Sequence, residues 1–181
     1  MSPQMALRVP RVPNRSYGEI MTEHPPMVTA SHPPAAVVRA INPLLRFLLR
    51  TPVMGSARKA MMVLSFTGRK SGQRYSVPVS AHVIDNDLYA LTDATWRLNF
   101  RGGASAEVLH DGKTATMHGV LIEDPSTVAE LSRRCAEAYG VKGAQRMMGL
   151  KFRDPRIPTT EEFAEAAKAN HVGAIRLTPP T

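Results

Sequence analysis

A short basic segment bounded by glycines, residues 68–72 (Gly-Arg-Lys-Ser-Gly), is the part of the chain best suited to binding an anion. Arg69 offers a forked guanidinium and Lys70 an ammonium, while Ser71 and the exposed amides of a turn can donate hydrogen bonds to phosphate or carboxylate oxygens. Gly, Ser and Lys are also ordinary residues of solvated hairpin turns. The segment alone therefore leaves two interpretations open, an anion site and a plain turn.

Strand-like patterns flank these residues, which we call the basic turn. Residues 61–67 are almost continuously apolar, which predicts a buried strand. Residues 73–84 alternate apolar and polar side chains, which predicts a second strand with one apolar and one polar face. Pro78 has no amide hydrogen, so it predicts an edge, a bulge or a ladder position open to a ligand. A cationic turn between two strands indicates a cofactor site.

Further along the chain, turn residues and apolar periodicity mark a series of short elements. We expect strands over residues 88–92, 106–110, 114–122 and 172–178, and a helical or irregular crossover over residues 96–100. Helices are expected after Asp124 as far as Gly140, over residues 143–150, and from Thr159 to Asn170, where Thr159 and Glu162 match a capping box. Hairpins with interrupting helices predict an α+β fold built on an antiparallel barrel.

The beginning of the chain has a different character. Residues 1–36 contain seven prolines and little periodicity, so we expect an extended or disordered basic arm. Residues 37–53 place apolar side chains at helical spacing with arginines on the opposite stripe, which predicts an amphipathic helix. This helix has two interpretations, packing on the core or lying on a membrane surface. The length of 181 residues predicts one globular domain, residues 37–181.

Positive charge is concentrated before the first hairpin ends. Residues 1–74 carry 11 basic and two acidic side chains, whereas residues 75–181 carry 12 basic and 13 acidic ones, so the first part holds all of the excess charge of +8. An anionic cofactor, an anionic membrane or a nucleic acid would be attracted by such a field. Nucleic acid is the least expected partner, because few aromatic residues and no nucleic-acid-binding motif accompany the charge.

Cysteine and hydropathy patterns bear on the compartment. The single Cys135 has no partner for an internal disulfide, which favours a reducing cytoplasm. No stretch has the apolar length of a membrane span, and the proline-rich start lacks the apolar centre of a signal peptide, so we do not expect export. The six histidines show no close ligand spacing, so we expect no metal site.

Three segments in a fixed order give the chain a family resemblance: residues 67–73 (Thr-Gly-Arg-Lys-Ser-Gly-Gln), 77–79 (Val-Pro-Val) and 96–103 (Trp-Arg-Leu-Asn-Phe-Arg-Gly-Gly). This order resembles the deazaflavin (coenzyme F420)-dependent nitroreductase family, within the split β-barrel flavin-binding superfamily. The resemblance extends over residues 40–124 and more weakly over the last helix and strand. It implies a split β-barrel, a homodimer, and hydride transfer from reduced coenzyme F420 to a small electron-poor or quinone-like substrate.

The resemblance also implies roles for individual residues. The basic turn would cradle the phosphodiester and acidic tail of the coenzyme, the second strand would lie along the deazaflavin ring, and the crossover would border the phosphate and ribityl region. A proton donor would be useful after hydride transfer, and side chains on the second strand and the long helix are candidates. The implied cofactor-binding residues are Gly68, Arg69, Lys70, Ser71, Gly72, Ser76, Val77, Pro78, Trp96 and Asn99, and the candidate catalytic residues are His82 and Tyr139.

The chain departs from the family pattern in two ways, and the first of them supports an alternative function. Only Asp93, Ala94 and Thr95 separate Thr92 from Trp96, where family members often have a longer, glycine-containing loop that contacts the coenzyme. A tyrosine-rich C-terminal substrate pocket is also not evident. The alternative is a non-catalytic split-barrel protein that binds a lipid, haem or another hydrophobic ligand near the inner face of the membrane. FMN, haem or no cofactor are accordingly the alternatives to coenzyme F420.

Overall fold

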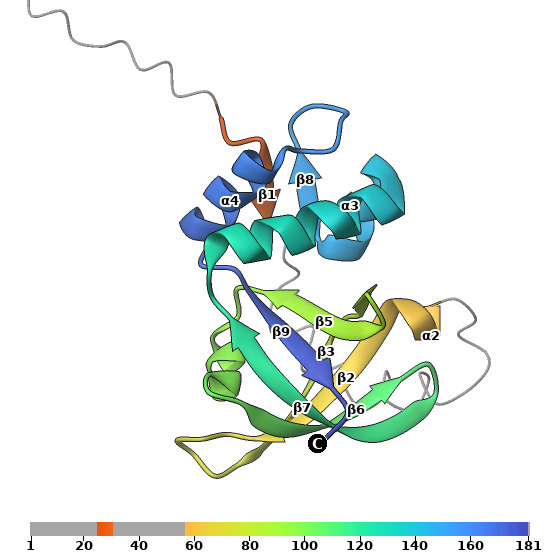
Figure 1. Cartoon of the computed structure of the whole chain (residues 1–181), viewed down its shortest axis with the longest axis vertical. Coiled ribbons are helices and arrows are strands. Elements are labelled where there is room, and N and C mark those ends of the chain that lie inside the picture. Colours follow the sequence, from red (N-terminus) through yellow and green to blue (C-terminus); the bar gives the residue numbers. More distant parts are fainter. Residues whose placement is uncertain (1–24, 31–56, 181) are drawn as a thin grey trace, which may run out of the picture.

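A half-barrel of strands and a cap of helices follow one another along the long axis of the molecule (Figure 1). The computed structural model describes residues 25–30 and 57–180. The sheet is antiparallel and curled, and the two longest helices lie over one end of it. This α+β architecture, a curled antiparallel half-barrel with flanking helices, confirms the fold class that the sequence predicts.

Seven strands build the half-barrel in the order β3–β2–β6–β7–β9–β5–β4, and every neighbouring pair is antiparallel. β3 and β4 form the two edges of this sheet, although only Ala81 separates them in the sequence. The chain therefore joins the two edges directly. The strands are β2 (Met61–Thr67), β3 (Arg74–Ser80), β4 (His82–Ile84), β5 (Asp87–Thr92), β6 (Ala104–His110), β7 (Lys113–Ile122) and β9 (Gly173–Thr178).

The prediction of one strand over residues 73–84 is wrong, because the chain changes partners at Ala81. β3 pairs with β2, whereas β4 pairs with β5. The amide of Ala81 donates to the carbonyl of Ala60, 3.0 Å away, at the end of the helical turn α2 (Ala57–Ala60). Side chains continue to alternate between the two faces of the sheet across this break. The polar residue His82 is nevertheless the buried one, at 1% exposed, whereas the apolar residue Val83 is 60% exposed. The polar face becomes buried here because helix α3 (Pro125–Met148) covers it, and His82 contacts Tyr139 of this helix.

The register of the β2–β3 hairpin explains why Pro78 is tolerated in a strand. The amide of Gly68 donates to the carbonyl of Gln73 at one end of the ladder, and the Ala81–Ala60 bond closes the other end. Because bonded and non-bonded pairs alternate in an antiparallel ladder, Pro78 falls in a pair that exchanges no hydrogen bonds. Its missing amide hydrogen therefore costs the sheet nothing, and β3 is an edge strand, as Pro78 predicts.

Apolar side chains fill the interior of the half-barrel. Phe100 comes from the short helix η2 (Thr95–Phe100) and is fully buried. A Cβ atom on Gly119 of β7 would lie 2.6 Å from Cδ1 of Phe100, so this glycine allows η2 to approach the sheet closely. The buried core consists of Met62, Leu64, Phe66, Ala81, Leu88, Ala90, Phe100, Ala106, Val108, Ile175 and Leu177.

Two helices and a two-stranded sheet form the cap: α3 (Pro125–Met148), α4 (Thr160–Ala169), β1 (Val28–Ala30) and β8 (Leu150–Phe152). Gly140 interrupts α3 with a φ of 67°, where the sequence predicts the end of a first helix. The predicted capping box at Thr159 and Glu162 is present and confirms the start of α4. None of the helices in the described part of the chain is long and apolar enough to cross a bilayer.

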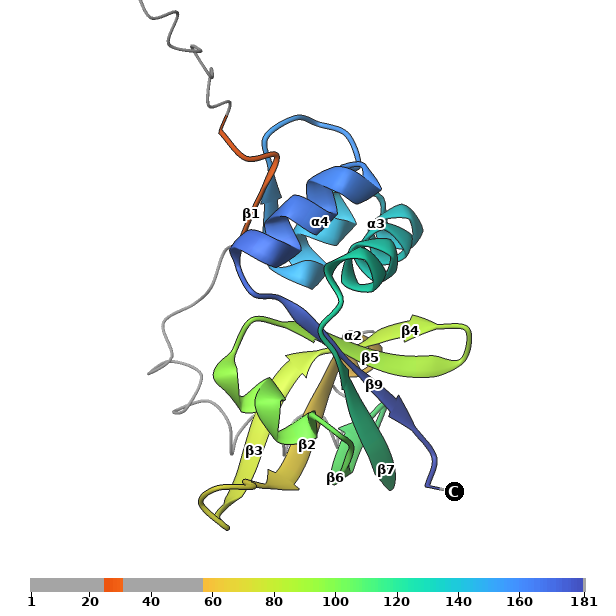
Figure 2. The ribbon, with the colours of Figure 1, turned by 60° about the vertical axis from the view of Figure 1, so that its left-hand side comes forward.

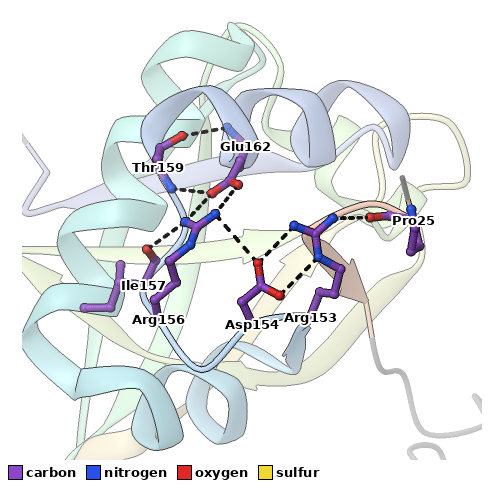
Figure 3. A network of polar contacts seen from close by, with 7 residues as sticks. All are labelled: Pro25, Arg153, Asp154, Arg156, Ile157, Thr159 and Glu162. Atoms are coloured by element: carbon purple, nitrogen blue, oxygen red, sulfur yellow. Dashed lines mark hydrogen bonds and ion pairs between the residues drawn. The ribbon is translucent and has the colours of Figure 1, made fainter. Parts of the chain in front are cut away.

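β1 and β8 lie in segments for which the sequence predicts no strand. They pair with each other, and Met27 and Val28 are buried against the cap. Arg153 donates through its guanidinium to the carbonyl of Pro25, 3.0 Å away, and is itself held by Asp154 in a polar network that reaches α4 (Figure 3). Residues 25–30 of the predicted arm are thus extended and packed on the cap, whereas the predicted helix, residues 37–53, lies outside the described residues.

Candidate functional site

The basic turn closes the β2–β3 hairpin at the end of the half-barrel away from the cap (Figure 2). Tyr75 shapes this turn. A Cβ atom on Gly68 would lie 2.6 Å from Cε2 of Tyr75 and 2.6 Å from Oγ of Ser71, so only glycine fits beneath the tyrosine ring. The hydroxyls of Tyr75 and Ser71 are hydrogen-bonded at 3.1 Å, and Gly72 takes a left-handed φ of 65°.

The turn is anchored to η2 through Asn99. The main-chain amide of Arg69 donates to Oδ1 of Asn99 at 2.9 Å, and Nδ2 of Asn99 donates to the carbonyl of Trp96 at 2.7 Å. The guanidinium of Arg69 donates to the carbonyl of Arg101 at 2.8 Å. The structure therefore brings together the basic turn and the crossover residues that the sequence analysis places in one site.

Two positive side chains at the turn are available to an anion. Arg69 and Lys70 are exposed and form no ion pair with any residue in the described ranges. The main-chain amides of Lys70 and Ser71 have no hydrogen-bond acceptor within the same ranges, although the hydroxyl of Ser71 is occupied by Tyr75 and by the amide of Gln73. The Ser71 hydroxyl, which the sequence predicts as a donor to an anion, is thus used within the turn. The amides of Lys70 and Ser71 and the charges of Arg69 and Lys70 have no partner of this kind among the described residues.

Neighbouring arginines differ from these two because they have acidic partners. Arg101 forms a forked pair with Glu123, with N–O distances of 2.8 and 2.6 Å, and these hydrogen bonds lower the pKa of Glu123. Arg74 lies 3.4 Å from Glu107. Arg69 and Lys70 thus differ from Arg74 and Arg101 in having no acidic partner within the described residues.

An aromatic cluster supports the turn from the barrel side. Phe66 lies at its centre, with ring centroids 5.8 Å from Tyr75, 5.8 Å from Trp96 and 5.1 Å from Phe100. Trp96 is partly buried and packs on the core. Trp96 thus contacts Phe66 next to the turn.

The predicted ring-binding strand is β3. Val77 packs toward the barrel interior, while Ser76 and Pro78 lie on the opposite face, where Oγ of Ser76 is 3.2 Å from Oγ of Ser65. The hydrogen-bonding alternation described above turns the main-chain groups of Ser76 and Ser80 away from β2, toward the edge of the sheet.

The candidate catalytic residues His82 and Tyr139 contact each other but not the basic turn. Nδ1 of His82 lies 3.1 Å from the hydroxyl of Tyr139, and this contact joins β4 to α3. About 20 Å of extended strand, the length of β3, separates His82 from the turn. Burial lowers the pKa of His82 to about 4, so its ring is neutral at neutral pH, and burial also raises the pKa of Tyr139.

The loop between β5 and η2 is as short as the sequence indicates. β5 ends at Thr92 and η2 begins at Thr95. Nη1 of Arg97 donates to the carbonyl of Asp93 at 2.6 Å and to that of Ala94 at 3.2 Å, which closes the loop on itself.

Sequence reasoning missed Tyr75 and Arg101 as parts of this site. Tyr75 falls within the alternating pattern of residues 73–84, and the available signal was an aromatic residue three positions after Gly72, opposite Phe66. The contribution of Arg101 is its carbonyl oxygen, which accepts from Arg69. No side-chain pattern reveals such a main-chain contact.

The fold and the turn together define an α+β half-barrel protein with a cationic hairpin tip. No protein-family model matches the chain, and no curated protein matches it. One similar solved structure, described as a domain-swapped dimer, is 12% identical with a TM-score of 0.40, over 80% of this chain and 100% of that one. Another, the conserved hypothetical protein Rv2991 from Mycobacterium tuberculosis, is 15% identical with a TM-score of 0.41, over 84% of this chain and 83% of that one.

Proposed function

We propose that this protein is an oxidoreductase that uses coenzyme F420 to reduce a small electron-poor or quinone-like molecule. The observation that carries the proposal is the anchoring of the basic turn to Asn99, which holds Arg69 and Lys70 beside the aromatic cluster without an acidic partner in the described residues. Charge-assisted hydrogen bonds from such groups are among the strongest that a protein offers to phosphate or carboxylate.

The donor set of the turn fits the anionic part of the coenzyme. Two cations and the amides of Lys70 and Ser71 would bind the phosphodiester and the acidic tail. β3 would lie along the ring, and Trp96 would exclude water from the turn end of the barrel. The coenzyme, when bound, supplies the hydride.

We retain Tyr139 as the proposed proton donor and His82, whose ring contacts the Tyr139 hydroxyl, as the residue that positions it. β3 leads directly from the basic turn to His82, so a ring bound along this strand would extend toward the end of the sheet where the pair lies. Both side chains are neutral at neutral pH, and the phenol of Tyr139 keeps its proton because burial raises its pKa. Homodimer formation and peripheral contact with an anionic membrane are further parts of the proposal.

A titration tests the proposal directly. Purified protein is titrated with oxidised coenzyme F420 while the coenzyme fluorescence is followed, in parallel with FMN and haem. We expect quenching at micromolar coenzyme, and at least about tenfold weaker binding for an R69A/K70A double variant. K59A/K113A removes two exposed lysines elsewhere and serves as the matched control. Absence of quenching in the unaltered protein would sink the proposal.

The alternative, a carrier of a lipid or haem inside the barrel, has less support. The interior of the half-barrel is filled by the buried core described above. An apolar cavity of about 60 Å³ lies instead in the cap, between β1, α3 and α4, with Val28, Met148 and Phe163 among its lining residues. Binding of haem but not of coenzyme F420 in the same titration would favour the carrier.

A further inference from the structure

The C-terminal end of α3 and strand β8 enclose an open groove of about 490 Å³. Its lining residues are Lys142, Gln145, Arg146, Gly149, Leu150 and Lys151. Both elements belong to the cap, whereas the basic turn lies at the opposite end of the half-barrel (Figure 1). The groove is therefore separate from the site described above.

Three positive side chains converge on this groove. Lys142 and Arg146 are four residues apart on α3 and so lie on the same helix face, and Lys151 reaches the groove from β8. All three are exposed, and none forms an ion pair with a residue that the structure describes. No acidic residue lies between Glu137 and Asp154 in the sequence, and these two are paired with Arg133 and Arg153, so the repulsion among the three cations is not relieved by neighbours in the chain.

The groove is held in a fixed shape by main-chain contacts. Gly149 ends α3 in the left-handed conformation, with a φ of 64°, and its amide donates to the carbonyl of Gln145. The side-chain Oε1 of Gln145 accepts from the amide of Phe152 at 3.0 Å, which ties β8 to the last turn of the helix. The end of α3 and β8, which carry the cations, thus have a fixed relative position, and this reduces the entropy lost when the cations bind one ligand.

We propose that this groove binds a phosphate-bearing ligand with at least two negative charges. The helix dipole favours cations at the C-terminal end of α3 and accounts for Arg146 on its own. It does not account for Lys151, which lies beyond the helix on β8. A phosphomonoester accepts hydrogen bonds from several cations at once, whether it belongs to a soluble compound or to a lipid headgroup.

Two probes distinguish these sources. Inorganic pyrophosphate is titrated into the full-length protein by calorimetry at low and at physiological salt. Flotation is measured with phosphatidylcholine vesicles that contain or lack phosphatidic acid. Binding of pyrophosphate supports a soluble ligand, and selective flotation with phosphatidic acid supports a headgroup. Failure of both probes to bind would overturn the proposal.

A charge-matched pair of variants locates the binding. K142A/R146A/K151A removes the three cations of the groove, and we expect at least about tenfold weaker binding of the probe. K59A/K113A/K168A removes three exposed lysines elsewhere and should bind as the unaltered protein does. If both variants lost the same affinity for the probe, the loss would follow from the lower net charge alone, and the assignment of binding to the groove would be overturned. The loss caused by K142A/R146A/K151A should be the same in the R69A/K70A background, where the basic turn no longer contributes its cations to binding of the probe, which keeps this test independent of the coenzyme proposal.

Discussion

The main-chain amide of Arg69 donates a hydrogen bond to Oδ1 of Asn99, 2.9 Å away and 30 residues later in the chain. Asn99 in turn donates to the carbonyl of Trp96, so one side chain satisfies both the hairpin tip and the crossover. This contact converts an exposed basic turn into a fixed part of the barrel end. It also makes Asn99 a positioning residue whose effect on ligand binding can be separated from its effect on stability.

Two substitutions of Asn99 should separate these effects. N99A removes both hydrogen bonds, and we expect a loss of about 1 kcal/mol in the free energy of unfolding with a smaller change in coenzyme affinity. N99D keeps an acceptor for the Arg69 amide but places a negative charge beside the proposed anion site, so affinity should fall more than stability. Denaturant unfolding and fluorescence titration measure the two quantities. N170A, at the end of α4, is the control, and equal behaviour of N99A and N99D would contradict the anchoring role.

Substitution of Gly68 should destabilise the protein through a steric clash, and substitution of Gly72 through backbone strain. G68A places a Cβ against Tyr75 and Ser71, and we expect a loss of about 1–3 kcal/mol. G72A meets no atom within 4 Å but must hold a φ of 65°, which costs about 1–2 kcal/mol. Thermal unfolding of both variants in a Y75A background tells them apart. The cost of G68A should shrink there while that of G72A should not, and an unchanged cost of G68A would argue against the contact.

Stability should fall in acid because of His82. Burial lowers the pKa of His82 to about 4 in the folded protein, below its ordinary value of 6.5. Between these values the unfolded chain binds the proton and the folded chain does not, so stability is complete above pH 6.5 and decreases as the pH falls toward 4. The full effect is about 3 kcal/mol. Urea unfolding from pH 7.5 to 4 should show this slope in the unaltered protein. The H82Q variant should lack the part due to His82, so parallel slopes would refute the assignment.

Local patterns predicted much of the fold. The apolar run over residues 61–67 coincides with β2, and Thr159 with Glu162 marks the start of α4. Both signals depend only on neighbouring residues. The break at Ala81 depends instead on which strand each half pairs with, and β1 and β8 are three residues long and stabilised by one another. No sequence window contains that information.

In the candidate site too, neighbouring residues could be interpreted from the sequence, whereas contacts between distant residues could not. The composition of the basic turn is evident from the sequence, and the motif order places Asn99 near it. The pairing of His82 with Tyr139 joins residues 57 positions apart, and their burial follows from helix α3 covering one face of β4. Alternation in the strand correctly assigns His82 to the face opposite Val83. It carries no information on which face a helix will cover.

Because β1 pairs with β8, residues 25–30 are packed on a part of the protein that lies more than 100 residues later in the chain. Residues 25–30 connect to the half-barrel through residues 31–56, yet their contacts with the described residues are to the cap, through Arg153 and the β8 ladder. A protease cut within residues 31–56 would therefore leave two pieces joined by a short ladder and the buried side chains of Met27 and Val28. The nicked protein should migrate as one species under native conditions and as two fragments in denaturant.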